Sequence, residues 1–197
     1  MHMAQLSNEA LARELLAPVT IAKPGVCVLT ARDVENDPTN GLIVHGHPAL
    51  KHKLGIAREL LLRDLAAAMQ RGPVFDSPQV LREWLRLYCA RIEHEVFLVL
   101  YLDAHHALFE AEEMFRGTLT QTSVYPREIV KGALRRNAAA VAFAHPHPSS
   151  GCAEPSRADE FLTSTLRHAL NLVDVRVIDH FIVSGNAVLS MAERGLV

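Results

Sequence analysis

The hydrophobic positions in the first part of the chain predict helices. Ser7 can cap a short helix that extends to about Leu16, and residues 48–72 form a long helical pattern that Gly72-Pro73 terminates. Between these segments, residues 18–41 carry the turn signals Pro24-Gly25 and Asp37-Pro38 and predict irregular structure.

A further helix is expected over residues 76–92. Ser77 is placed as its N-cap and Pro78 as its first helical residue. Its apolar stripe, which we expect to be core, consists of Val80, Leu81, Trp84, Leu85 and Tyr88.

After residue 94 the pattern alternates between short apolar runs and amphipathic segments. The runs predict strands at residues 95–103, 107–115, 139–145, 174–185 and 186–192, and the amphipathic segments predict helices at 125–138 and 154–172. Strands alternating with helices indicate an α/β fold, a sheet flanked by helices. We therefore expect two domains, a smaller and mostly helical region over residues 1–75 and an α/β domain over residues 76–197.

The composition is that of a globular protein, with 49% hydrophobic and 21% charged residues. A net charge of −2 argues against a protein built mainly to hold nucleic acid. The N-terminus lacks the features of a secretory signal, and no apolar run is long enough to span a membrane. The odd number of cysteines, 3, disfavours a disulfide framework. We expect a soluble, cytoplasmic protein without membrane association.

The segment "AHPHPSSGCAEPSRADE", residues 144–160, holds the candidate chemistry. Side chains alternate along a strand, so His145 and His147 point the same way, about 6–7 Å apart, and can share one metal ion. Asp159, one turn inside the following helix, can add an oxygen ligand. Three protein ligands with a fourth position left for water are the arrangement of a catalytic zinc site.

Simpler interpretations exist for each of these residues. A Ser-x-x-Asp sequence at a helix start is close to a capping box, which alone would explain Ser156 and Asp159. His45 and His47 have the same spacing as His145 and His147, yet no carboxylate follows them within ten residues. The spacing of two histidines alone is therefore a weak indication of a metal site. Cys152, in the loop, is either an inert thiol or a further ligand.

Three segments resemble the RadC-type branch of the MPN/JAMM metalloprotease superfamily. They are "EHEVFLVLYLD", "FRGTLTQTSVYPREIVKGALRRNAAAVAFAHPHPSSGCAEPSRADE" and "VRVIDHFIVSG". That family's signature is His-x-His, seven residues, Ser, two residues and Asp, with a glutamate on an earlier strand. The resemblance implies a three-layer fold with a mixed β-sheet between helices.

Carried onto this chain, the resemblance implies that His145, His147 and Asp159 bind Zn²⁺. It makes Glu95 the general base and Ser156 the residue that hydrogen-bonds the reacting oxygen. Glu93, two residues before Glu95, competes for the role of base, although a solvated residue at a helix–strand junction is the simpler interpretation.

The chain departs from the family pattern at two points. Eight residues, 148–155, separate His147 from Ser156 instead of seven, and proline stands between the histidines where asparagine is usual. We expect the loop at 149–153 to bulge, because lengthening a loop costs less than shifting the helix, whose Phe161, Leu162, Leu166 and Leu170 should pack on the sheet.

The leading functional hypothesis is a zinc-dependent hydrolase that cleaves a peptide or isopeptide bond of a peptide or protein substrate. A second is a DNA-associated repair protein, either a metal-dependent nuclease or a non-hydrolytic DNA binder, and a third is a non-catalytic MPN scaffold. Asp179-His180 fits either buried structure or support of the metal site. The weak argument for DNA association is a basic character shared by Arg116, Arg127, Lys131, Arg135 and Arg136.

Overall fold

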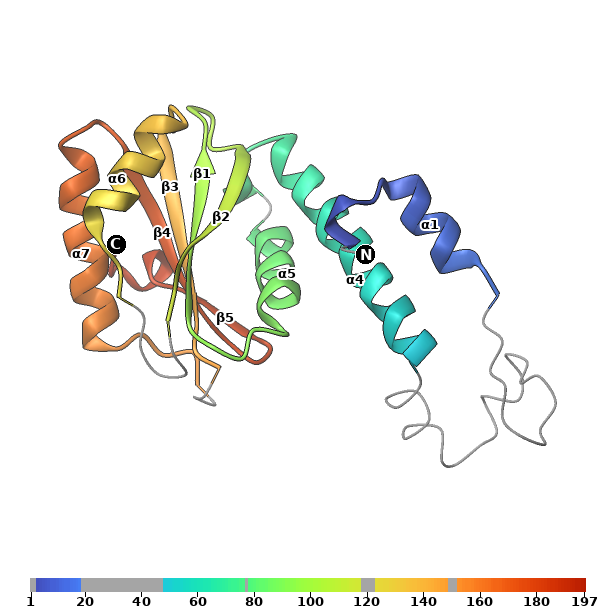
Figure 1. Ribbon diagram of the computed structural model, residues 1–197. Helices are drawn as coiled ribbons and strands as arrows, with labels where there is room; N and C mark the ends of the chain where they lie inside the picture. The colour runs from blue at the N-terminus through green and yellow to red at the C-terminus, as the bar shows by residue number, and fades with distance from the viewer. Residues whose placement is uncertain (1–2, 19–47, 77, 118–122, 149–151) are drawn as a thin grey trace. The chain divides into compact units, whose positions relative to one another are not determined.

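The computed structural model describes residues 3–18, 48–76, 78–117, 123–148 and 152–197 (Figure 1). It contains two compact units, Met1–Asp64 and Leu65–Val197. This division falls within helix α4 (Pro48–Gln70), whereas the division expected from the sequence falls at residue 75.

The first unit contains helix α1 (Asn8–Leu16) and the first part of α4, and the sequence predicts both helices. Ser7 caps α1, since its side chain accepts a hydrogen bond from the backbone of Ala10. At the other end of α1, Lys53 of α4 donates to the carbonyl oxygens of Glu14 and Leu15. A cation at a helix C-terminus satisfies carbonyls that have no partner within the helix.

The second unit is a mixed five-stranded sheet with helices on both faces. The strands are β1 (Val96–Leu102), β2 (Leu108–Arg116), β3 (Ala140–Pro146), β4 (Arg176–Ser184) and β5 (Ala187–Ser190). The helices are α5 (Pro78–Cys89), α6 (Pro126–Arg135) and α7 (Arg157–Asn171), with 3₁₀ turns at Val74–Asp76 and Ala192–Arg194. The α/β prediction is therefore confirmed, and each expected strand and helix of this unit is present.

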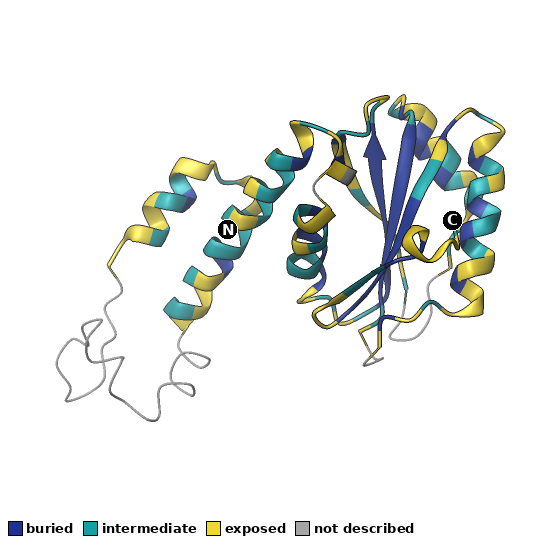
Figure 2. Cartoon of the chain, turned by 180° about the vertical axis from the view of Figure 1, so that it is seen from behind, coloured by how far each residue is buried: buried dark blue, intermediate teal, exposed yellow. Residues whose placement is uncertain are grey.

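The strand order is β2-β1-β3-β4-β5, and only β3 and β4 run parallel. Helices α6 and α7 cover one face of the sheet, and α5 lies on the other (Figure 1). Every position of β1 and β3 is buried, as the dark central strands of Figure 2 show. Strands covered on both faces need continuous apolar sequences, which is why these two runs lack polar alternation.

The face beneath α6 and α7 holds a hydrophobic core. Its buried residues are Phe97, Val99, Tyr101, Ile129, Ala133, Ala138, Val141, Phe143, Leu166, Leu170 and Val175. On the opposite side, α5 buries Leu81, Trp84 and Leu85, three of the five residues of its expected apolar stripe. The expected N-cap of this helix, Ser77, lies outside the described residues.

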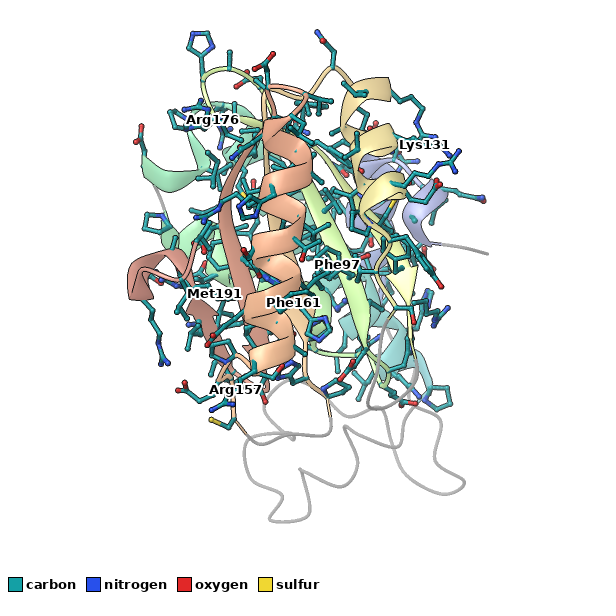
Figure 3. All side chains as sticks on the ribbon, turned by 90° about the vertical axis from the view of Figure 1, so that its left-hand side faces the viewer. Phe97, Lys131, Arg157, Phe161, Arg176 and Met191 are labelled. Atoms are coloured by element: carbon teal, nitrogen blue, oxygen red, sulfur yellow. The ribbon has the colours of Figure 1, made fainter. Side chains whose placement is uncertain are left out.

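One expectation about α7 is wrong. Leu166 and Leu170 are fully buried and Leu162 packs against the core, but Phe161 is 76% exposed, on the outer side of the helix that faces the viewer in Figure 3. Asp159 and Thr163 are the buried residues of the first turns instead. Positions 159, 163, 166 and 170 share one helical face, so the side of α7 that meets the sheet is polar at its N-terminal end.

The topology brings three segments to one end of the sheet. Because β1 and β3 are antiparallel, the start of β1, preceded by Glu95, lies beside the end of β3, which carries His145. The chain after β3 returns into the N-terminus of α7, which carries Asp159.

Candidate metal centre

His145 and His147 lie at the end of β3. The His145 ring is buried, and the backbone N–H of His147 donates to the carbonyl of Val183 on β4, which continues the β3–β4 pairing past Pro146. The two ring centroids are 4.9 Å apart, with the ring planes at 88°. The two imidazoles, separated in sequence by Pro146, thus lie side by side at this end of the sheet.

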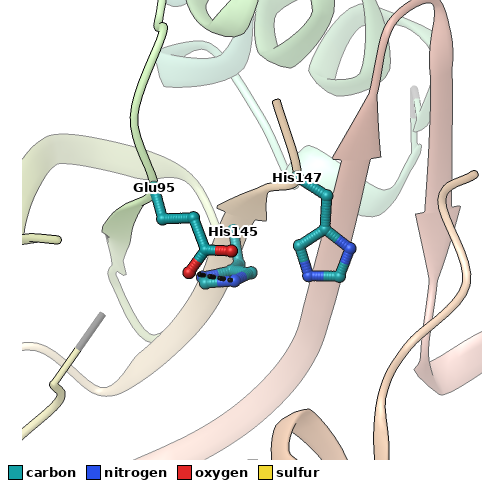
Figure 4. A group of neighbouring side chains, drawn as sticks. All are labelled: Glu95, His145 and His147. Atoms are coloured by element: carbon teal, nitrogen blue, oxygen red, sulfur yellow. Dashed lines mark ion pairs between the residues drawn. The ribbon is translucent and has the colours of Figure 1, made fainter. Parts of the chain in front are cut away.

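Glu95 reaches the same point from the start of β1 (Figure 4). Its Oε2 lies 3.7 Å from Nε2 of His145. Single ligand atoms of Glu95, His145 and His147 lie within 4.8 Å of one another, close enough to hold one metal ion between them. Glu93, in contrast, is exposed, which agrees with its interpretation as a solvated residue.

Asp159 faces both histidines from the first turn of α7. Its Oδ1 lies 3.9 Å from Nε2 of His145, and its Oδ2 lies 3.6 Å from Nε2 of His147. Oδ2 also accepts hydrogen bonds from the backbone N–H (2.7 Å) and the hydroxyl (2.6 Å) of Ser156. Ser156 is the N-cap of α7 and closes a capping box with Asp159. Capping therefore does take place, and the same carboxylate still points toward the imidazoles.

The surroundings of His145 keep its ring neutral. Burial lowers the pKa of His145 to about 4, although the nearby Asp159 carboxylate acts in the opposite direction. A metal ligand must be an unprotonated imidazole, so the ring is in the required form at neutral pH without competition from a proton.

The Asp159 carboxyl is held in its charged form. Burial alone would raise its pKa, but the hydrogen bonds from Ser156 and the nearby His145 and His147 outweigh burial, and the net pKa lies below its ordinary value. Every ion pair of Asp159 within the described residues is with a histidine. A buried anion with two hydrogen-bond donors and a neutral imidazole as neighbours would be stabilised further by a bound cation.

A divalent cation fits this donor set. Two imidazole nitrogens and carboxylate oxygens are ligands that zinc accepts in hydrolytic sites, where three protein ligands leave one position open. Glu95 and Asp159 would provide the negative charge that such an ion balances. The fit concerns the kind of donor and its charge, and it applies to zinc and to other divalent metals that accept nitrogen and oxygen.

The other candidates from the sequence stand apart from this site. Cys152 is exposed and does not belong to the metal-binding group found among the described residues. Lys131, Arg135 and Arg136 pair with glutamates on α6 and β2, so their charge is largely compensated. His45 and His47 lie outside the described residues, as does most of the loop expected to bulge.

Two residues near the site were not recognised as linked from the sequence. Thr163, on the buried face of α7, donates a hydrogen bond to the carbonyl of Asp159 and contacts His180 of β4. The neighbouring Asp179 is not part of this contact between α7 and β4. It accepts hydrogen bonds from Ser190 and from the backbone of Ala192. No periodicity signals these contacts, since they depend on how α7 docks on β4.

Comparison with known proteins shows which family this chain resembles. Residues 75–196 match the family model described as the RadC-like JAB domain. A UPF0758 protein of Leptothrix cholodnii is 56% identical over 164 residues, which cover 83% of this chain and 73% of the relative. A UPF0758 protein of Aromatoleum aromaticum is 53% identical over 187 residues, covering 94% of this chain and 80% of the relative.

None of the helices in the described part of the chain combines the length and apolar character that crossing a membrane requires.

Proposed function

The chain belongs to the RadC-like JAB domain family, and from this premise we propose that it is a zinc-dependent hydrolase of peptide or isopeptide bonds. The observation that supports the proposal is the convergence of the Glu95 carboxylate with the His145 and His147 imidazoles within 4.8 Å. Asp159 would complete the set from α7, since its carboxylate oxygens lie 3.9 and 3.6 Å from Nε2 of His145 and His147. His145, His147 and Asp159 would hold the ion, which leaves Glu95 as the carboxylate able to exchange protons.

A zinc ion bound here would polarise a substrate carbonyl and lower the pKa of a water molecule to about 7. Glu95 would accept a proton from the attacking water and return it to the leaving nitrogen. The 3.7 Å between its Oε2 and Nε2 of His145 supports this role. This role requires a carboxylate that can change protonation state, which an amide cannot do.

Ser156 is the candidate for stabilising the oxygen of the tetrahedral intermediate. Its hydroxyl now donates to Oδ2 of Asp159 at 2.6 Å. To serve a substrate carbonyl oxygen, this hydroxyl would have to rotate away from Asp159, whose Oδ2 would keep the backbone donor of Ser156 at 2.7 Å. The oxyanion would then receive a donor that is positioned by the helix cap.

The test uses the full chain, stripped of metal and reloaded with zinc, on internally quenched peptides and on an isopeptide-linked substrate. Glu95→Gln should retain zinc and lose hydrolysis, because the two side chains share a shape and only the carboxylate accepts a proton. Glu93→Gln, two residues away and exposed, is the matched control and should keep activity. Loss with Glu93→Gln but not Glu95→Gln would show that the base is misassigned.

The same preparations should be offered single-stranded and duplex DNA. Cleavage of DNA without cleavage of any peptide or isopeptide would contradict the proposal and support the nuclease alternative. If the reloaded chain held no metal, the zinc hydrolase and the metal-dependent nuclease would both be contradicted, and a non-catalytic scaffold would be supported.

A further inference from the structure

His180 is a fully buried histidine whose ring centroid lies 6.4 Å from that of His145, one of the proposed metal ligands. It lies on β4 with its ring edge-on to those of Phe97 and Phe143, at centroid distances of 5.5 and 5.8 Å. Its Nε2 has no hydrogen-bond partner among the described residues. An imidazole among aromatic rings is less favourable than an apolar side chain of similar size, so its presence calls for an explanation.

The only hydrogen bond that its ring makes within the described residues joins Nδ1 to Oγ1 of Thr163, at 2.7 Å. The same hydroxyl lies 2.6 Å from the carbonyl oxygen of Asp159. A carbonyl can only accept, and a hydroxyl has one proton to donate. Thr163 therefore donates to Asp159, and Nδ1–H of His180 donates to Thr163. The order of donors is His180, Thr163, Asp159.

This chain of hydrogen bonds fixes the first turn of α7 to the sheet. His180 is paired across the parallel strands with Phe143, two residues before His145 on β3. Asp159 is in the first turn of α7. The link thus joins the helix that carries one proposed metal ligand to the part of the sheet that carries another.

We propose that Thr163 and His180 are positioning residues that hold Asp159 at the distance from His145 and His147 required for a shared metal ion. The inference rests on the proposed metal site and identifies two residues that support it without touching the ion. Groups that orient metal ligands set metal affinity, and their loss typically weakens binding by about 10–100-fold.

A purely structural role gives a different expectation. A buried hydrogen bond that only stabilises the core lowers the stability of the metal-free chain and leaves the zinc dissociation constant of the folded chain unchanged. Zinc affinity, measured apart from stability, separates the two roles.

The experiment compares Thr163→Val, which keeps the branched shape and removes the hydroxyl, with Thr163→Ser, which keeps the hydroxyl. Zinc is titrated into the metal-free full chain in competition with a chromophoric chelator, and the thermal midpoint is measured without metal. Thr163→Val should weaken zinc binding by about 10–100-fold, and Thr163→Ser should restore affinity close to that of the unaltered chain.

Leu170→Ala is the matched control. Leu170 is fully buried on the same face of α7, near its C-terminal end. This change should lower the thermal midpoint and leave zinc affinity unaltered. If Thr163→Val does not fold, His180→Asn against His180→Leu gives the same comparison, because the asparagine amide can replace the Nδ1 donor and leucine cannot.

The outcomes separate this inference from the proposed function. If the unaltered chain binds no zinc, both are overturned. If it binds zinc, and Thr163→Val or His180→Leu binds equally well, only the positioning role is overturned. Weakened binding in these variants, with unchanged binding in Leu170→Ala, supports it.

Discussion

Ser156 and Asp159 hold each other by three hydrogen bonds at the start of α7. The backbone and the hydroxyl of Ser156 donate to Oδ2 of Asp159, and the backbone of Asp159 donates to the Ser156 hydroxyl at 3.2 Å. The same carboxylate lies 3.6 Å from His147 and 3.9 Å from His145. The helix cap thus orients the residue that faces the histidines, and capping and metal binding are compatible.

Ser156→Ala separates the two tasks. It removes the hydroxyl from the cap, and the free energy of unfolding should fall by about 1 kcal/mol, as for other N-cap serines. Zinc should remain bound, because the backbone of Ser156 still orients Oδ2 and the remaining oxygen faces His145. Urea denaturation of the metal-free chain and zinc content of the purified chain measure the two effects.

Asp159→Asn is the complementary variant. The amide keeps the size of the side chain but not its charge, so zinc content should fall sharply. If Ser156→Ala and Asp159→Asn lost zinc to the same extent, Ser156 itself would have a part in holding the ion.

Gly132 on α6 permits the close approach of the helix to β1. A Cβ at this position would lie 2.5 Å from the hydroxyl of Tyr101 and 2.9 Å from Cε of Met114. Tyr101 cannot easily move, since its hydroxyl donates a hydrogen bond to Glu112. In addition, Cζ of Arg136 lies 4.4 Å from the centroid of its ring. Overpacking of this kind costs about 1–3 kcal/mol.

We therefore expect Gly132→Ala to lower the free energy of unfolding, although alanine is favoured over glycine in helices by up to about 1 kcal/mol. Gly72→Ala is the control, since a Cβ at Gly72 meets no atom within 4 Å. Urea midpoints of the two variants measure the effect. A Gly132→Ala chain as stable as Gly72→Ala would show that α6 can shift on the sheet without cost.

The strands and the proposed ligands were accessible from the sequence because both depend on local pattern. Continuous apolar runs such as 96–102 and 140–144 identify central strands, and the spacing of His145, His147 and Asp159 identifies a shared point at one end of the sheet. The sheet order and the parallel pairing of β3 with β4 were not predicted, since no local pattern encodes them and the family resemblance implied only a mixed sheet between helices.

The buried face of α7 and the contacts around the site depend on tertiary packing, which the sequence pattern does not show. Apolar periodicity predicts Phe161 as a core residue, yet the docking of α7 buries Thr163 and Asp159 and leaves Phe161 76% exposed. The hydrogen bonds of Thr163 with His180 join residues 17 positions apart on two elements. Thr163 interrupts the apolar pattern of α7 and has no role that the sequence pattern predicts, although it links α7 to His180 on β4 beside the site.

Asp179 gives a prediction about pH. Burial raises the pKa of its carboxyl above the ordinary 3.8, and the hydrogen bonds from Ser190, Ala192 and His180 only partly oppose this. A raised pKa in the folded state means that the folded chain holds the proton more tightly than the unfolded chain. The stabilisation from this group is fully present below pH 3.8 and is lost as the pH rises through the raised folded pKa.

Asp179→Asn does not titrate, and its amide oxygen can still accept the backbone N–H groups of His180 and Ala192. The stability of the unaltered chain relative to Asp179→Asn should therefore decrease as the pH rises from below 3.8 toward neutrality. Urea denaturation of both chains across this range measures the difference, in which all other titrations cancel. A difference that grows with pH would mean that the three donors outweigh burial and that the folded pKa is lowered.

Zinc itself should stabilise the folded chain, because the three proposed ligands come together only when β3 and α7 pack. A ligand at 100 times its dissociation constant adds about 2.7 kcal/mol to the stability of the native state. The thermal midpoint of the metal-free chain should rise on addition of zinc, and His145→Ala should abolish the rise. His45→Ala should leave it intact, because no carboxylate follows that pair within ten residues to act as a third ligand. If the rise instead disappeared in His45→Ala and persisted in His145→Ala, the metal would be held by the first histidine pair, and the group at the end of β3 would be a buried polar cluster without an ion.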